Sequence, residues 1–143
     1  NEEVLMSKLQ LNVGDSFTYS KTVSESDVYL FAGITGDFHP NHVNEAYMKK
    51  SVYGKRIMHG ALGIGFMSAA SSVALDKQSL RAVSAGYDHI RFIKPVFIGD
   101  TSTGRYTIES KDEAAMKTVA NVELLNEAGE LCTVGKHIAK YFD

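Results

Sequence analysis

The chain has 143 residues, a length that fits one compact domain, which we expect to span residues 1–143. With 44% hydrophobic and 22% charged residues, its composition is that of a soluble globular protein and excludes a disordered chain or a membrane protein. A formal net charge of -2, without a long Lys/Arg run, argues against nucleic acid as a partner.

Targeting and membrane signals are not visible in the sequence. It begins Asn1-Glu2-Glu3, without a basic region followed by an apolar run, so we expect no secretory signal and a cytoplasmic location. The longest uncharged stretch, residues 60–75, is shorter than the roughly 18 to 20 residues that a spanning helix needs. It predicts a buried helix, with no membrane as a partner. The single cysteine, Cys132, is expected to be a small buried hydrophobic side chain.

In chain order, the first predicted elements are a strand over residues 16–23 and a helix directly after it. Ser24 is typical of an N-cap, and Asp27 three residues later is typical of a capping box. Apolar residues then recur at helical spacing to about residue 34. Gly36 is expected to end this helix.

A loop is predicted for residues 37–42, because Pro40 lacks an N–H and pushes His39 away from helical conformation. A short helix over about residues 44–50 follows. The next helix, over about residues 60–76, is apolar or small on all sides. This pattern predicts that other elements enclose most of its surface.

The rest of the chain predicts an antiparallel sheet. Period-two alternation is clearest over residues 116–125, and similar strand candidates cover residues 83–93, 101–110 and 131–142. One enclosed helix and about five strands, helix-rich early and strand-rich late, predict an α+β fold in which a curved sheet wraps the helix.

The densest polar cluster lies in the predicted loop, where Asp37, His39 and His42 are close in sequence. A carboxylate and an imidazole that share one water can activate it and return a proton, which is what hydration requires. The turn at Pro40 makes such convergence of Asp37 and His42 possible. An N-capping Asp beside surface histidines is the alternative that composition alone favours. A metal site is a third alternative; we expect none, because zincin histidine spacing and paired cysteines are missing.

A second candidate is His59-Gly60, at the predicted start of the long helix. Free backbone N–H groups and the helix dipole favour negative charge there, so Gly60 could hold a developing oxyanion. A glycine also lets a substrate carbonyl approach closely. Gly60 as a mere packing residue is an equally good interpretation.

A third segment, residues 87–96, combines strand alternation with two basic residues near a proline-marked strand end. Arg91 and Lys94 could meet phosphate groups there. Charges that only solvate the edge of a sheet are the favoured alternative for either residue.

Three segments together resemble one known family. They read Phe31-Ala32-Gly33-Ile34-Thr35-Gly36-Asp37-Phe38-His39-Pro40-Asn41-His42, Arg56-Ile57-Met58-His59-Gly60 and Arg91-Phe92-Ile93-Lys94-Pro95-Val96-Phe97-Ile98-Gly99-Asp100. The first resembles the hydratase motif of MaoC-like, (R)-specific enoyl-CoA hydratases, the second the segment that leads into the family's central helix, and the third its late strand pair. Order and spacing also match, so the resemblance covers most of the chain.

The resemblance implies a hot-dog fold, a homodimer or higher homo-oligomer, and reversible addition of water to a trans-2-enoyl thioester. It implies Asp37 and His42 as the catalytic pair and Gly60 as the backbone donor to the thioester carbonyl. No separate cofactor is expected, because coenzyme A or acyl carrier protein forms part of the substrate.

Further residues are expected around the substrate. Ser68 falls where the family often has an active-site serine. The family pattern has Asn in place of His39 and an aliphatic residue in place of Asn41, so the pocket mouth is expected to be more polar here. The predicted substrate-binding residues are His39, Asn41, His59, Ser68, Arg91 and Lys94.

Two other functions stay open on the sequence. A hot-dog acyl-CoA thioesterase also places a His-Gly-type segment at its central helix and would release free thiol. A non-catalytic acyl-CoA-binding module would keep the pocket without the chemistry.

Overall fold

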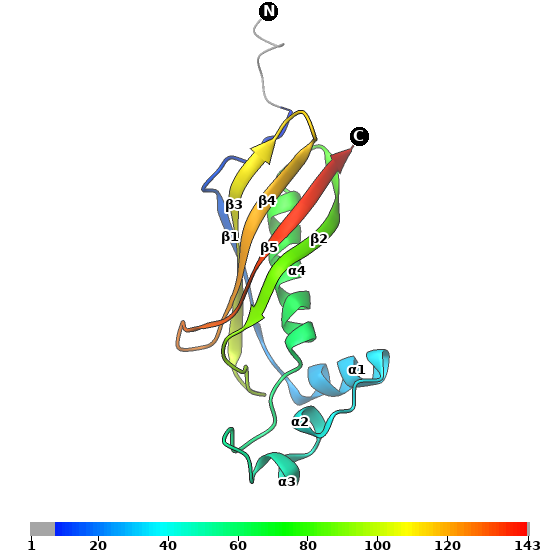
Figure 1. The fold of residues 1–143 in the computed structure, drawn as a ribbon, viewed down its shortest axis with the longest axis vertical. Coiled ribbons are helices and arrows are strands. Elements are labelled where there is room, and N and C mark those ends of the chain that lie inside the picture. The colour runs from blue at the N-terminus through cyan, green and yellow to red at the C-terminus, as the bar shows by residue number, and fades with distance from the viewer. Residues whose placement is uncertain (1–7, 143) are drawn as a thin grey trace, which may run out of the picture.

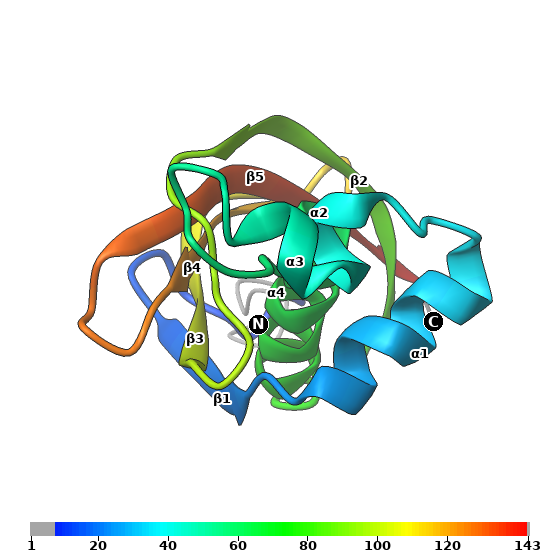
Figure 2. The same cartoon turned by 90° about the horizontal axis from the view of Figure 1, so that it is seen from below.

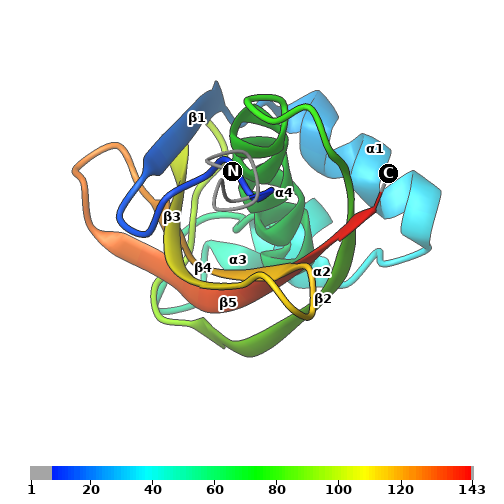
Figure 3. The same cartoon turned by 90° about the horizontal axis from the view of Figure 1, so that it is seen from above.

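The structure, a computed structural model, describes residues 8–142 as a five-stranded sheet curved around one long helix (Figure 1 and Figure 3). The strands are β1 (Ser16–Thr22), β2 (Arg81–Phe92), β3 (Thr101–Asp112), β4 (Lys117–Leu125) and β5 (Leu131–Phe142). The helices are α1 (Glu25–Thr35), α2 (Pro40–Val43), α3 (Glu45–Met48) and α4 (Gly60–Leu75). The predicted α+β, hot-dog arrangement is confirmed.

Two expectations concern the ends of the chain and membranes. The predicted lack of a secretory signal falls on residues 1–3, which lie outside the described residues. Within residues 8–142, no helix is both long and apolar enough to span a membrane.

The sheet has the strand order β1-β3-β4-β5-β2, and every neighbouring pair is antiparallel, as predicted. Burial alternates along β3 and β4, where Tyr106, Ile108, Val122 and Leu124 point inward and are at most 1% exposed. This alternation is the period-two pattern of a sheet that is covered on one face. β1 and β2 are the edge strands.

The long helix α4 lies in the concave face of the sheet. Its buried residues are Gly63, Phe66, Met67, Ala70, Ser71 and Ala74. Gly104 of β3 allows close approach, because a Cβ there would lie 3.0 Å from the carbonyl oxygen of Phe66. The opposite face of α4 is exposed, so the predicted enclosure holds only for the sheet-facing side. This exposed stripe consists of Ala61, Gly65, Ser68 and Ser72.

The termini of α1 follow the predicted signals. The Ser24 hydroxyl accepts from the Asp27 N–H and the Asp27 carboxylate accepts from the Ser24 N–H, each at 3.0 Å, which completes the capping box. Gly36 ends the helix with φ 85°, a left-handed conformation that glycine adopts without steric cost. The chain therefore turns sharply just before Asp37.

The prediction of a loop over residues 37–42 is wrong for its second half, because α2 begins at Pro40. Proline is well suited to the first position of a helix, where its missing N–H costs no hydrogen bond. The next helix ends at Met48 and is shorter than predicted. Figure 1 and Figure 2 show that α1, α2 and α3 gather at the end of the molecule where α4 begins.

Candidate active site

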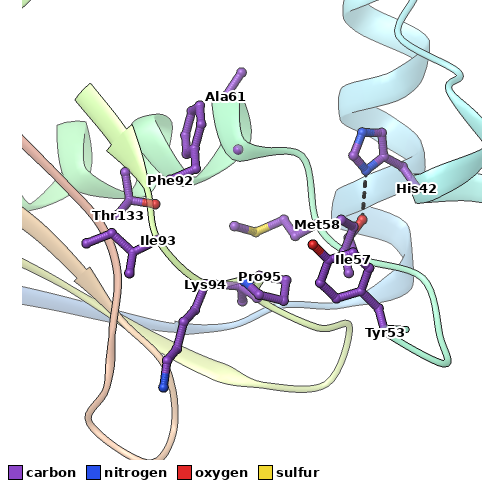
Figure 4. Close-up of a pocket in the computed structure, with 12 residues that line it drawn as sticks. His42, Tyr53, Ile57, Met58, Ala61, Phe92, Ile93, Lys94, Pro95 and Thr133 are labelled. Carbon is purple, nitrogen blue, oxygen red and sulfur yellow. Dashed lines mark hydrogen bonds between the residues drawn. The ribbon is translucent and has the colours of Figure 1, made fainter. Parts of the chain in front are cut away.

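A pocket of about 360 Å³ opens where α4 begins, between α2 and the end of β2 (Figure 4). Its lining is mainly apolar and includes few polar groups, a composition typical of sites for small apolar ligands. The lining residues are His42, Tyr53, Ile57, Met58, Gly60, Ala61, Phe92, Ile93, Lys94, Pro95, Val96 and Thr133.

The ring of His42 is oriented by the backbone ahead of α4. Its Nδ1 lies 2.8 Å from the carbonyl oxygen of Ile57, so Nδ1 carries the proton and donates it (Figure 4). The N–H of Ile57 donates in turn to the carbonyl of Asn41 at 3.0 Å. These two hydrogen bonds join α2 to the segment before α4, and they leave Nε2 of His42 with a free lone pair.

The environment of His42 favours the neutral ring. Burial lowers the pKa of His42 below its ordinary value of 6.5, and the neighbouring His59 and His39 imidazoles lower it further. The Ile57 carbonyl and the Asp37 carboxylate act in the opposite direction but do not cancel this shift. His42 is therefore a proton acceptor at neutral pH.

Asp37 follows the Gly36 turn, and its carboxylate is exposed. Its Oδ1 accepts from the N–H of His39 at 3.3 Å. One side-chain ligand atom each of Asp37, His42 and His59 lies within 4.8 Å of the others. A water that donates one hydrogen bond to each of two acceptors, at about 2.8 Å, bridges acceptors about 4.5 Å apart. The structure thus brings Asp37 and His42 to a spacing that one water can bridge.

His59 is 1% exposed and lies between two rings. It stacks on His42 with ring centroids 3.8 Å apart at an interplanar angle of 26°, and it meets Phe31 at 4.7 Å and 58°. A metal ion must lie in the plane of each imidazole that binds it, about 2 Å from the nitrogen. Since the planes of His42 and His59 are nearly parallel and stacked, one ion cannot meet both rings in this arrangement, and the cluster does not fit a two-histidine metal site.

His39 and Asn41 lie beside the pocket and do not line it. Nδ1 of His39 accepts from the N–H of Asn41 at 3.3 Å, which makes His39 the N-cap of α2. Asparagine is among the residues that most often cap helices through a side-chain acceptor. His39 can therefore perform the capping that the family's usual Asn would perform.

Gly60 is the first residue of α4, and the N–H groups of a first helical turn have no partner within the helix. Gly60 and Ala61 both line the pocket. A Cβ at residue 60 would lie 2.6 to 2.9 Å from three atoms of the Phe92 ring. Both interpretations of Gly60, amide donor and packing residue, are compatible with this geometry, because its small size serves each.

Three predicted substrate-binding residues, Ser68, Lys94 and Arg91, do not present their polar groups to the pocket. Ser68 lies two turns along α4 from Gly60 on the exposed stripe, outside the lining of the pocket. Lys94 lines the pocket, but its ammonium pairs with Glu130 and points away from the other lining residues in Figure 4.

Arg91 is exposed and outside the lining, and its guanidinium donates to the carbonyl of Ile90 at 2.8 Å. The pairing of β2 with β5 shifts register between Asp88 and Arg91, and His89 has φ 56°. Such an irregularity changes the face to which the following residues point. The strand alternation that suggested a role for Arg91 is interrupted just before it.

Several lining residues were missed from the sequence. The segment over residues 87–96 attracted attention for its basic residues only. Its apolar members Phe92, Ile93 and Pro95 were the signal that could have predicted a pocket lining there. Tyr53 and Thr133 reach the pocket from distant parts of the chain, and no local pattern marks them. Arg56 was also missed: its guanidinium bonds to Glu25, Glu45 and the Tyr29 hydroxyl at 2.8 to 2.9 Å.

Residues 10–129 match the family described as MaoC like domain. The chain belongs to the MaoC-like domain family. An (R)-specific enoyl-CoA hydratase of Rhodospirillum rubrum is 43% identical to this MaoC-like chain over 95 residues, which make up 66% of the chain and 64% of that relative. The chain thus spans less than two thirds of this relative's length.

Two further proteins match the MaoC-like chain over most of its length. An (R)-specific enoyl-CoA hydratase of Aeromonas caviae is 25% identical over 135 residues, 94% of this chain and 98% of that protein. The structure of the R-hydratase PhaJ1 from Pseudomonas aeruginosa, in its unliganded form, superposes with a TM-score of 0.84 at 27% identity and covers 94% of this chain and 84% of that one. The fold of this MaoC-like chain is therefore shared over 94% of its length, not only in the motif.

Proposed function

We propose that this protein is an (R)-specific enoyl-CoA hydratase, which adds water reversibly to a trans-2-enoyl thioester. The observation that carries the proposal is the proximity of two proton acceptors, Asp37 and His42, which each offer a ligand atom within 4.8 Å of the other. His42 also lines an apolar pocket together with Gly60, the first residue of α4. The names of the relatives from Rhodospirillum rubrum and Aeromonas caviae support the same reaction.

In the proposed mechanism one water lies between the Asp37 carboxylate and Nε2 of His42. Both groups accept from it, since Nδ1–H of His42 is committed to the Ile57 carbonyl. The water oxygen attacks C3 of the enoyl group as Asp37 takes one of its protons. The second proton stays on the oxygen and becomes part of the product hydroxyl.

The electron pair of the C2–C3 double bond moves toward the thioester carbonyl, whose oxygen becomes an enolate oxygen. The N–H of Gly60, at the positive end of the α4 dipole, donates to this oxygen. The proton taken from water is then returned to C2 through the Asp37 and His42 pair. One water has been added, and the catalytic groups regain their starting protonation.

The acyl chain is proposed to occupy the apolar part of the pocket, against Ile57, Met58, Phe92 and Val96. The thioester is carried by coenzyme A in this proposal, and water is the only co-reactant, so the reaction needs no separate cofactor. A cytoplasmic location and a role in fatty-acid metabolism stay predictions.

A homodimer is proposed for the working enzyme. β2 is an edge strand, and Val83 and Phe92 on it are 50% and 59% exposed. Together with the exposed stripe of α4, they form a surface that a second copy would cover. Sedimentation as a monomer at micromolar concentration would contradict this part of the proposal.

The reaction is tested with crotonyl-CoA and longer trans-2-enoyl-CoA substrates. Loss of the enoyl ultraviolet absorbance, without release of free thiol, is the expected result. Thiol release at a comparable rate would identify a thioesterase instead. Tight binding of the substrate with neither change would identify a binding module, and either outcome would overturn the hydratase proposal.

A further inference from the structure

His59 is a buried histidine that the proposed reaction does not use directly, although it touches both members of the catalytic pair. Its Nε2 lies 2.9 Å from the main-chain carbonyl oxygen of Asp37, and its face stacks on the ring of His42. His59 also immediately precedes Gly60, whose amide is the proposed oxyanion donor. One side chain therefore contacts the loop, α2 and the start of α4.

The hydrogen bond to the Asp37 carbonyl fixes the tautomer of the His59 ring. A carbonyl oxygen can only accept, so Nε2 carries the proton and donates it. Nδ1 then carries a lone pair, and it is buried without a partner among the described residues. A buried polar atom without a partner costs free energy, commonly about 1 to 3 kcal/mol. An apolar ring of similar shape would avoid that cost, so packing alone does not explain a histidine here.

Two contacts hold the His42 ring, and they act in different directions. The Ile57 carbonyl holds His42 in the plane of its ring, through Nδ1, whereas the stacked His59 ring supports its face. The bond from His59 to the Asp37 carbonyl holds the residue that carries the carboxylate. An imidazole can make both contacts; phenylalanine can only stack, and glutamine can only donate.

We propose that His59 is a positioning residue that holds the Asp37 carboxylate and Nε2 of His42 at the spacing that one shared water needs. This inference rests on the proposed hydratase function. His59 does not touch substrate in this role. It acts through the orientation of the two residues that do.

The stacked His59 ring also affects the pKa of His42. The groups that face His42 are the imidazoles of His39 and His59, which lower its pKa, and the Asp37 carboxylate and Ile57 carbonyl, which raise it. Replacement of His59 by phenylalanine keeps the ring contact and the burial but removes one of the lowering contributions. The pKa of His42 should therefore rise in His59→Phe.

The test compares His59→Phe with wild type and with His59→Gln, which keeps a donor for the Asp37 carbonyl. In His59→Phe we expect kcat for crotonyl-CoA to fall about 100-fold with little change in KM, because misplaced catalytic groups slow the chemical step. The acidic limb of kcat/KM should move to higher pH. His59→Gln should retain a larger share of kcat than His59→Phe.

Val122→Ala is the matched control, because it removes buried volume from β4 without contact with the pocket. It should lower thermal stability while leaving kcat and the acidic limb unchanged. A folded His59→Phe enzyme with wild-type kcat and an unmoved acidic limb would overturn the proposal.

NMR of the His42 ring separates this inference from the proposed reaction, because it needs no substrate. Loss of the single Nδ1–H tautomer of His42 in His59→Phe, seen in the ring ¹⁵N shifts at neutral pH, supports the positioning role even if crotonyl-CoA is not turned over. A His42 ring that keeps the Nδ1–H tautomer and its hydrogen bond to the Ile57 carbonyl in His59→Phe would overturn it.

Discussion

The ring of Phe92 lies directly on Gly60, so close that a Cβ at residue 60 would approach three ring atoms to 2.6 to 2.9 Å. Phe92 ends the edge strand β2 and Gly60 begins α4, so this contact joins the sheet to the helix at the pocket. The aromatic ring covers one side of the first helical turn, and Gly60 and Phe92 both line the pocket.

Gly60→Ala should reduce activity strongly. The added methyl must displace Phe92, which alters the pocket beside the amide, and we expect kcat/KM to fall about 100-fold. Overpacking should also lower the free energy of unfolding by about 1 to 3 kcal/mol. Gly33→Ala is the matched control, because a Cβ there meets nothing within 4 Å on α1. It should keep full activity, and equal kcat/KM in both variants would contradict this account of Gly60.

Arg56 should be required for an ordered site. Its guanidinium joins Glu25 of α1, Glu45 of α3 and Tyr29 to the segment that leads to Gly60. The carboxylates are 62% and 46% exposed, so solvent screens the pairs and Arg56→Met should cost only about 1 kcal/mol of unfolding free energy. We expect kcat/KM to fall about tenfold, because α1 and α3 lose their anchor to the segment before α4.

Arg105→Met is the control for Arg56→Met. Arg105 pairs with Glu123 across β3 and β4, away from the pocket, at a similar distance of 2.9 Å. Chemical denaturation should show a comparable small loss of stability, and steady-state kinetics should show no loss of kcat/KM. A similar loss of activity in both variants would mean that stability, and not the anchor, explains the effect.

The pH dependence of the hydration rate should follow the protonation of His42. The proposed reaction needs neutral His42, and burial holds the pKa of His42 below 6.5. Activity should therefore stay high as the pH falls to about 6.5 and decline only as His42 becomes protonated below that value. Measurement of kcat/KM between pH 4.5 and 8, at constant ionic strength, tests this; an acidic limb centred above pH 6.5 would contradict it.

Stability should depend on pH through another histidine, His137. Its two ring nitrogens lie 2.7 Å from the hydroxyls of Ser84 and Tyr106, and burial lowers the pKa of His137 to about 4. A histidine with a lowered folded pKa contributes stability that is present above its unfolded pKa, about 6.5, and is lost as the pH falls toward 4. We expect the loss to reach about 3 kcal/mol at most.

The measurement is the free energy of unfolding by urea at pH values from 7.5 to 4.5. His137→Phe should flatten the decline below pH 6.5, although it also loses both hydrogen bonds. His89→Gln, which changes an exposed histidine of β2, should leave the decline unchanged. If His137→Phe keeps the wild-type slope, the assigned cause is wrong.

Much of the fold could be predicted because its signals are local. The capping box at Ser24, the glycine at Gly36 and the alternation over β4 each depend on a few neighbouring residues, and the structure confirms them. The helix at Pro40 was missed because four residues are too few to show a helical period. The cap that begins it is His39, a residue that local rules do not mark as a typical N-cap.

The site could be predicted only in part. Asp37 and His42 are five residues apart, so one motif marked both, and Gly60 followed from a helix start. The stack of His42 on His59 and the bond to Ile57 join residues 15 to 17 positions apart, and tertiary packing alone determines them. Cys132 was expected to be buried; it is 0% exposed, and burial raises the pKa of its thiol.

The most direct test of the central claim is the rate of crotonyl-CoA hydration by Asp37→Asn beside wild type. The amide keeps the size of the side chain but cannot take a proton from water, so we predict that kcat falls about 10²- to 10⁴-fold while the protein stays folded. Asp76→Asn, which changes an exposed carboxylate at the far end of α4, should keep the wild-type rate. Equal, measurable rates for Asp37→Asn and wild type would contradict the assignment of Asp37 as the catalytic base.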